Sequence, residues 1–497
     1  MTTIGRVVLI KLYVDWASTG SYTAESGNVI SANGTIRLAA PLTAIMASRS
    51  IVDQASITLV NRDQRYSSLL TSGGLYTVVG NGKAYHRPMY IEVSVNGGGL
   101  YTRIFTGVIK NYVENSVTSR NSGTITLDCR SREEEILNTK ISTGLAQFQA
   151  IYETPNNEGE IIGGWLDEAG LSGADYELDD GLYSIPWAAL LDESAIESAW
   201  DMAAGAGGRF YMRQSDGKFV YQNNQHWVFQ SSVKSIARSD YGGLSIKYPD
   251  QDLAKVVTAQ IYTGTLQPSD TIFTLEAPLT VAPGATLVHE AELDSPAYVV
   301  GDVAYTATTS GGANITADVT VTMTAYAQKL SFSIANANAQ AALIRLLTVD
   351  GQFVTTDSKE KATATSTDTF WTDVAEKKRA ISNRFVQSRG QAGGVASLTL
   401  AAGETPLINF GVDNLIGDPT LRVGDLVNIS DSKVMTTSVF SFVTAINWRF
   451  GTAGFMQTLE CVEAAQLIPY YNTSPGYFRL GSSKLGSTDP ARGRMYF

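Results

Sequence analysis

Histidine and cysteine are both scarce in this chain of 497 residues, which contains three histidines and two cysteines. Cys129 and Cys461 lie far apart and each ends an alternating segment, so we expect two buried thiols rather than a disulfide or a metal pair. His86, His226 and His289 are scattered, and none stands in HExxH or another metal-ligand spacing. The sequence therefore predicts no metal site and no cofactor.

Signatures of nucleophilic and phosphate chemistry are also missing, since there is no GxSxG elbow and no Gly-rich loop ending in GK[ST]. The segment from Ser430 to Lys433 fits S-x-x-K, but it lies in a polar turn without the companion motifs, which indicates a hairpin. Paired carboxylates could serve glycoside hydrolysis, yet helix caps and solvated faces explain them more simply. These pairs are Asp167/Glu168, Asp179/Asp180 and Asp192/Glu193. We predict that the protein is not an enzyme.

The sequence has fewer basic than acidic residues and lacks long apolar runs. The 37 Lys and Arg residues face 48 Asp and Glu residues, and the net charge of −11 argues against a protein that grips nucleic acid. An acidic surface can still let DNA pass without binding it. No run approaches the roughly 18 consecutive apolar residues of a membrane span, and residues 1–10 are typical of a strand rather than a signal peptide. We predict no stable membrane insertion and no export by a standard signal.

Strand patterns fill most of the chain. Ile57 and Leu59 alternate with polar neighbours, and residues 88–95, 101–109 and 123–130 alternate in the same way. We interpret residues 1–130 as a first antiparallel β-barrel, completed by about residues 236–265. Turns run through Gly34 in this interpretation. Residues 422–429, 439–448 and 457–462 predict a second barrel, within a unit at 366–469.

The pattern changes to helices at residues 131–235, where we predict an inserted α+β domain. Ser131 is the expected N-cap of a first helix, whose Glu133, Glu134 and Glu135 face the positive end of the helix dipole. Further helices are predicted at 158–170 and at 193–205, the latter started by Asp192. A hairpin at 209–221 turns at Asp216-Gly217.

Two more regions complete the predicted organisation of this mainly β, multidomain chain. Short Thr-rich and Val-rich strands at 266–365 favour a β-sandwich-like module. A helix is predicted at 368–385, with Asp368 as its cap and Trp371 on its apolar face. Residues 470–497 predict an extended tail, made basic by its candidate interaction residues Arg479, Lys484, Arg492 and Arg494.

The ends of the two predicted barrels resemble each other. Phe105-Thr-Gly-Val-Ile109 followed by Thr126-Leu-Asp-Cys129 matches Phe442-Val-Thr-Ala-Ile446 followed by Thr458-Leu-Glu-Cys461. The same order of turn and strands favours two copies of one barrel, although alternating strands also resemble one another by chance. Three such chains in a ring would present six barrels around one axis.

One further set of segments is residues 55–67, Arg87-Pro88, 105–109 and 126–131 near the start, and 423–427 and 478–486 near the end. Together these segments resemble the minor tail or tail-tip hub proteins of tailed bacteriophages. The resemblance spans most of the chain in the right order. It implies a homotrimeric hub with two tail-tube-like barrels per chain, which joins the sixfold tail tube to a threefold tip and lines or gates the DNA ejection channel.

The resemblance also implies partners and a location. The expected partners are further copies of the chain, the tail tube and distal tail proteins, a tip fibre or spike, the tape measure protein, and DNA that passes without specific binding. The expected location is the tail tip or baseplate of the virion, assembled in the host bacterial cytoplasm. Two alternatives stay open: a tail-associated cell-wall hydrolase, and a carbohydrate-binding or receptor-binding tail protein that stacks sugars on tryptophans. Core positions on or beside helices explain Trp165, Trp187, Trp200 and Trp371 more simply.

Overall fold

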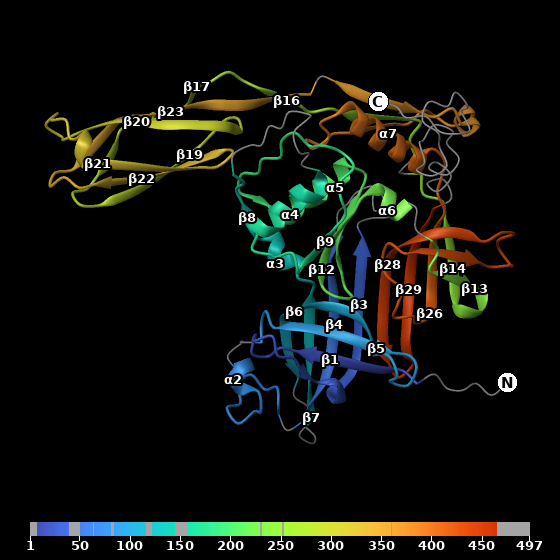
Figure 1. Ribbon diagram of the computed structural model, residues 1–497. Coiled ribbons are helices and arrows are strands. Elements are labelled where there is room, and N and C mark those ends of the chain that lie inside the picture. Colours follow the sequence, from blue (N-terminus) through green and yellow to red (C-terminus); the bar gives the residue numbers. More distant parts are fainter. Residues whose placement is uncertain are drawn as a thin grey trace.

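The computed structural model describes residues 7–38, 50–62, 64–80, 84–115, 122–144, 157–228, 231–250, 253–358 and 360–464. The predicted fold class is confirmed: the chain is mainly β and multidomain, with two β units side by side and an α+β domain above the first of them in Figure 1. The candidate interaction residues Arg479, Lys484, Arg492 and Arg494 lie outside the described residues.

The first β unit is an antiparallel sheet in the order β3-β4-β7-β6-β5-β1-β2. Its inward positions alternate along each strand as predicted, and Ile57 and Leu59 are both buried. Gly34 does not end a turn as expected but lies inside a strand. The elements are β1 (Leu9–Val14), β2 (Thr23–Ala24), η1 (Ser26–Asn28), β3 (Val29–Leu38), β4 (Ser50–Arg62), α2 (Tyr76–Val79), β5 (Pro88–Ser94), β6 (Thr102–Asn115) and β7 (Ser122–Arg130).

The second β unit has the order β14-β26-β29-β28-β27-β13. The expectation that residues 236–265 complete the first barrel is wrong, because β13 pairs with β27 and β14 pairs with β26 of this second unit. The elements are β13 (Lys234–Ala237), η3 (Arg238–Asp240), β14 (Gly243–Lys247), β26 (Asn409–Ile416), β27 (Leu426–Ser430), β28 (Val439–Gly451) and β29 (Gly454–Glu463). Both units belong to one 13-stranded sheet.

The α+β domain packs its helices on a three-stranded sheet of β11, β12 and β9. Ser194 caps its last long helix, because the Ser194 hydroxyl accepts from the Glu197 amide. The prediction that Asp192 starts this helix is wrong, since Asp192 lies before a short strand. Ser131 does not cap the first helix either. The elements are α3 (Glu133–Leu137), β8 (Lys140–Ile141), α4 (Glu158–Glu168), β9 (Tyr176–Leu178), β10 (Glu193–Ser194), α5 (Ala195–Gly205), β11 (Arg209–Arg213), β12 (Lys218–Gln222) and α6 (Asn224–Val228).

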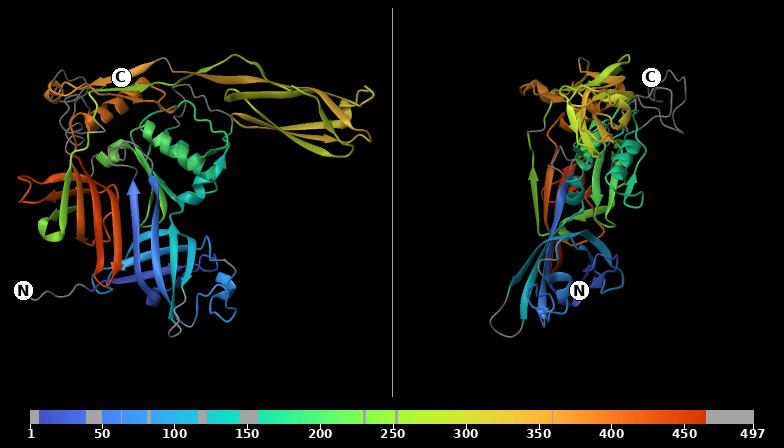
Figure 2. Two further views of the ribbon diagram at one scale, coloured as in Figure 1. Left: turned by 180° about the vertical axis from the view of Figure 1, so that it is seen from behind. Right: turned by 90° about the vertical axis from the view of Figure 1, so that its left-hand side faces the viewer.

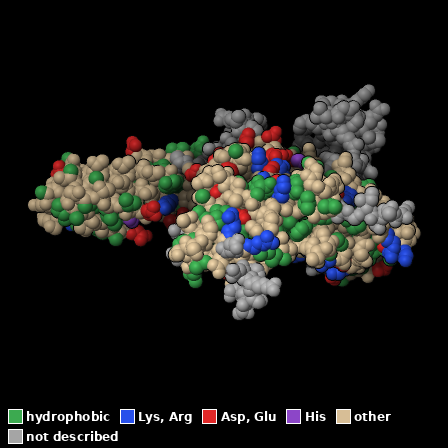
Figure 3. All heavy atoms as spheres, turned by 90° about the horizontal axis from the view of Figure 1, so that it is seen from below, with side chains coloured by type: hydrophobic (Ala, Val, Ile, Leu, Met, Phe, Trp, Pro, Cys, Tyr) green, Lys and Arg blue, Asp and Glu red, His purple; other side chains and the backbone are tan. Residues whose placement is uncertain are grey.

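Residues 263–357 form a two-layer β arm that extends away from the body (Figure 2). Its two sheets enclose a core that includes Phe332, Ile344 and Leu347. Figure 3 shows the arm from below as a narrow projection with mostly uncharged side chains. The strands are β16 (Thr263–Leu266), β17 (Asp270–Thr274), β18 (Leu279–Val281), β19 (Thr286–Glu292), β20 (Ala297–Thr308), β21 (Val319–Ala325), β22 (Lys329–Asn336) and β23 (Ala342–Asp357), with η4 (Thr316–Asp318).

A helix covers a small sheet at the root of the arm, but not where the sequence predicts one. The predicted helix at 368–385 is wrong: its residues form the short η5 (Thr369–Thr372), capped by Asp368 as expected, and a strand. Ala375 and Ala380 of its supposed apolar face are exposed. The helix is α7 (Arg389–Gly403), which packs on β15 (Val256–Gln260), β24 (Lys361–Thr365) and β25 (Lys378–Ile381).

Candidate functional site: the joint between the two β units

The long strand β28 belongs to both β units. Its first part pairs with β27, where Leu426 lies opposite Phe442. Its later part pairs with β3, where Trp448 lies opposite Gly34 and Phe450 lies opposite Ala32. One backbone ladder therefore runs from the second unit into the first, and we call this β28–β3 contact the joint.

A close approach of backbone and side chain defines the centre of the joint. A Cβ added to Gly34 would lie 2.5 Å from Cζ2 of the buried Trp448 and 2.7 Å from the carbonyl oxygen of Gln54. Only glycine leaves room for the indole here. The Thr35 hydroxyl donates to Oδ1 of Asn447 over 2.8 Å, so the joint also has a polar contact between side chains.

The two units repeat each other down to a shared irregularity. In the first unit Ile109 lies opposite Cys129, and a bulge follows before Asn111. In the second unit Val443 lies opposite Cys461, and a bulge follows before Ala445. β6 therefore corresponds to β28, and β7 to β29, with the bulge at the same step.

The predicted repeat is confirmed for the strands that end in cysteine, and its other half needs a shift. Because Ile109 corresponds to Val443, Phe442 matches Val108 and not Phe105. The sequence match of two phenylalanines was wrong by three residues, because it aligned a shared Phe-x-x-x-Ile pattern, whereas the position of the bulge fixes the correspondence.

Buried polar groups fasten the α+β domain to the first β unit. Asp53 on β4 accepts from Nε2 of Gln214 over 2.7 Å and from the amide of Arg37 over 2.9 Å. Oε1 of Gln214 accepts from the amide of Thr106 over 2.9 Å. Burial raises the pKa of Asp53 well above its ordinary value, and the charge of Glu133 raises it further.

Glu133 has a different role from the one predicted. It is buried, where it accepts from the Met212 amide over 3.1 Å and from the Ser131 hydroxyl over 2.8 Å. The sequence suggested three equivalent carboxylates facing a helix dipole. The first of them instead connects α3 to β11.

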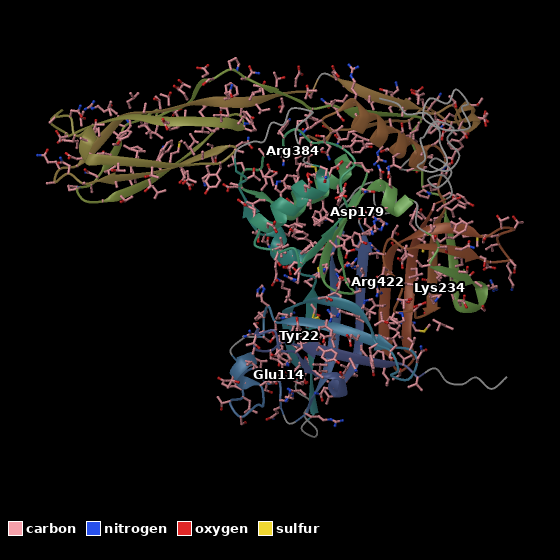
Figure 4. All side chains as sticks on the ribbon, viewed as in Figure 1. Tyr22, Glu114, Asp179, Lys234, Arg384 and Arg422 are labelled. Carbon is pink, nitrogen blue, oxygen red and sulfur yellow. The ribbon has the colours of Figure 1, made fainter. Side chains whose placement is uncertain are left out.

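Arginine side chains connect the α+β domain to the second β unit. Nε of the buried Arg209 donates to Gln222 over 2.9 Å, and its Nη2 donates to the Gly424 carbonyl over 3.4 Å. Burial lowers the pKa of Arg209 and of Arg422, and the carboxylate of Asp425 acts in the opposite direction on both. Figure 4 places Arg422 at the centre of the molecule.

A cavity of about 200 Å³ lies where these three parts meet. Its lining includes Ile36 and Trp448 from the joint, Tyr211 from the α+β domain, and Arg422 from the second unit. The cavity is thus lined by residues of all three parts, which meet at this place.

The three histidines lie in three separate places. Nδ1 of His86 lies 3.1 Å from Glu135, and Nδ1 of His226 lies 2.8 Å from Asp179. His289 stacks on Phe332 in the arm. Among the residues that the structure describes, no group of three or more His, Cys, Asp or Glu side chains is placed to hold a metal ion.

The other chemical candidates occupy ordinary structural positions. Ser430 ends β27, and Lys433 lies in the following turn, where its amide donates to Asp431. Asp167 accepts from the Tyr176 hydroxyl, and Glu193 pairs with Arg384. Glu168 is the last residue of α4, and the Asp179 carboxylate contacts His226. The backbone carbonyl of Asp180 accepts from the Asn223 side chain, and the Asp192 carboxylate accepts from the Ser142 hydroxyl.

Both cysteines are free and buried, as predicted. The four tryptophans Trp165, Trp187, Trp200 and Trp371 are also buried, as their core interpretation requires. Searching the described part of the chain for a helix long and apolar enough to cross a membrane finds none.

The sequence reasoning missed the residues of the joint. Gly34 was placed in a turn, and Trp448 was placed in a strand without a partner. A glycine inside an alternating run was the available signal, because such a glycine often marks close backbone approach.

Comparison with solved structures gives this architecture a counterpart. A tail protein from Neisseria meningitidis MC58 superposes with a TM-score of 0.50 over 93% of this chain and 98% of that chain, at 8% identity. A 43 kDa tail protein of prophage MuSo2 from Shewanella oneidensis gives 0.49 over 93% and 98%, at 10% identity. The prophage tail protein gp18 from Listeria monocytogenes EGD-e gives 0.42 over 91% and 94%, at 9% identity.

No family model matches the sequence, and no curated protein sequence matches it. At 8% identity, the similarity to the Neisseria protein establishes the fold. The chain has the fold of a tail protein over nearly its whole length, which confirms the resemblance inferred from the sequence at the level of the fold.

Proposed function

We propose, from this tail-protein fold, that the chain is a structural hub of a bacteriophage tail tip or baseplate. The observation that carries the proposal is the joint, where β28 pairs with β3 and so connects two copies of one β unit in a single sheet within one chain. Such a duplication suits a ring-shaped adaptor, because two like units per chain double the symmetry of the ring. The hub is not an enzyme in this proposal, and its work is mechanical.

The geometry supports a homotrimer. Two like units per chain become six like units when three chains surround one axis, so a threefold assembly can meet a sixfold tube. The tail tube and distal tail proteins would contact one side of this ring, and a tip fibre or spike would contact the other. The tape measure protein and DNA would pass through the channel that the ring lines or gates.

The negative net charge of the chain suits a channel through which DNA passes. A net charge of −11 leaves few clustered cations to neutralise phosphate, so DNA would slide past without specific binding. The place of action would be the tail tip of the virion, after assembly in the host bacterial cytoplasm.

Light scattering on the purified chain, paired with class averages from electron microscopy, tests the proposal. We expect the mass of three 53.4 kDa chains and a ring with a central hole and six similar lobes. A monomer, both in solution and in isolated tail particles, would overturn the hub. Glycan-array binding and peptidoglycan release, measured on the same sample, would then decide for the receptor-binding or hydrolase function.

A further inference from the structure

Among the open strand edges in the described part of the chain, two belong to β14 and β6 of the 13-stranded sheet. β14 ends the 13-stranded sheet and pairs only with β26. The last part of β6, residues 111–115, pairs with β7 on one side, while the ladder to β5 on its other side stops at Val108. Val113 is 40% exposed. Both edges present unpaired backbone groups, which are templates for another strand.

These two edges are the counterparts of the two strands that form the joint. β6 corresponds to β28, as the shared bulge shows. β14 corresponds to β3 by the same reasoning: Ile246 lies opposite Phe410 on β26, as Gly34 lies opposite Ala55 on β4. Ala55 lies opposite Cys129, and Phe410 lies opposite the equivalent Cys461.

The two open edges of one molecule cannot pair with each other. β6 lies in the first β unit and β14 at the far side of the second one, with the other strands of the sheet between them (Figure 1). Figure 4 shows the same separation between Glu114 on β6 and Lys234 on β13. A contact between them must therefore join two copies head to tail, and such a contact either closes a ring or continues without end.

We propose that β14 of one copy pairs antiparallel with residues 111–115 of β6 in a second copy, and that this pairing repeats the register of the joint. Thr35 lies opposite Asn447 in the joint, so Lys247 lies opposite Val113 between copies. Ser245 lies opposite Asn115 by the same rule. The inference rests on the proposed trimer, for which it names the contact: three joints within chains and three between them complete the ring.

Side chains at the two edges fit a contact with a second copy of the chain. The aliphatic part of Lys247 can cover Val113 while its ammonium group stays in water. Pro249 follows β14 by two residues and has no N–H for a ladder, so the contact between copies stays short. The joint within the chain is longer, with six residue pairs from Ala445 to Phe450.

A cysteine pair tests the register on the full chain. We would combine Val113→Cys with Lys247→Cys and treat the protein with a short bis-maleimide. Covalent dimers and trimers are expected on a denaturing gel, and only monomers for either single variant. Cys129 and Cys461 are each 1% exposed and do not compete.

The matched control is Thr35→Cys with Asn447→Cys, the same position of the joint within one chain. This pair should be bridged by the reagent without any increase in mass to dimer or trimer. One result would overturn the proposed contact and leave the hub standing. In that result light scattering shows a trimer and the reagent bridges the control pair, but it does not bridge Val113→Cys with Lys247→Cys. A monomeric protein, in solution and in tail particles, would overturn both.

Discussion

Glu158 is a buried carboxyl group at the first turn of α4, where Oε1 accepts from the Tyr183 amide over 3.1 Å. Burial raises its pKa to about 7. A carboxyl whose pKa is raised in the folded state contributes stability below its unfolded pKa, near 4.5, and loses that contribution as the pH rises through about 7. Glu158→Gln removes this dependence.

We therefore predict a difference between wild type and Glu158→Gln that changes with pH. The free energy of unfolding of the wild type should fall relative to the variant by about 3 kcal/mol between pH 4 and pH 8. Urea unfolding at several pH values measures it. Glu197→Gln, which removes an exposed carboxylate from the first turn of α5, is the control. Parallel pH curves for wild type and Glu158→Gln would refute the prediction.

A second residue-scale prediction concerns Gly34. Gly34→Ala places a Cβ within 2.7 Å of the Gln54 carbonyl oxygen and closer still to Trp448, so the joint must open. Overpacking of this kind costs about 1–3 kcal/mol of unfolding free energy. Gly243→Ala on the equivalent strand β14 is the control, because its nearest neighbour would be Asp413 Cβ at an ordinary 3.6 Å. Equal stability of the two variants in chemical denaturation would contradict the tight joint.

At the scale of elements, α7 depends on one buried amide. Nε2 of Gln391 donates to the carbonyl oxygens of Gly205 and Phe385 over 2.9 and 2.8 Å, and its Oε1 accepts from the Gln387 amide over 2.9 Å. Gln391→Leu leaves these backbone groups unpaired, each at about 1–3 kcal/mol. We expect chemical denaturation to show a loss of at least about 3 kcal/mol.

The matched control on the same helix is Arg389→Gln. The Arg389 side chain is 81% exposed and pairs with Glu360 at the surface, so we expect a change below about 1 kcal/mol. If Gln391→Leu were as mild as this control, the amide would not hold α7 in place.

Sequence patterns predicted the elements whose pattern is local. The alternation at Ile57 and Leu59, the Asp216-Gly217 turn, and helices α4 and α5 all follow from periodicity and turn chemistry. α7 was missed because it contains Gly390, Gly393, Gly394 and Gly403, which together have low helix propensity. Tertiary packing overrides that propensity: a Cβ at Gly394 would lie 2.5 Å from the Tyr183 hydroxyl oxygen.

The joint was beyond sequence reasoning for a different reason. A strand alternates in the same way whichever neighbour it has, so Trp448 predicts a buried face but not the approach of Gly34. Glu133 was misread similarly, because its sequence neighbours resemble a solvated first turn, while its hydrogen-bond partner Met212 and the nearby charge of Asp53 come from other elements.

At the scale of the whole molecule, the arm should be dispensable for the ring, because none of the strands β3, β28, β6 and β14 belongs to it. Leu266 lies opposite Val354 at the root of the arm. Replacing residues 267–353 by Asn-Gly closes these two strands as a hairpin. We expect this variant to keep the oligomeric state of the full chain in light scattering. Dissociation into monomers would place an assembly contact on the arm.

The joint has a consequence for synthesis of the chain on the ribosome. Thr35 and Asn447 are 412 residues apart, so the edge of β3 emerges long before the strand that covers it. At about 5–20 residues per second, this edge waits on the order of 20 to 80 s for its partner. During that time a nascent chain exposes the same kind of edge that β14 presents in a single folded chain. Newly made chains on one messenger are thus at risk of pairing with each other too early, and a chaperone that shields β3 would raise the yield of correctly closed molecules.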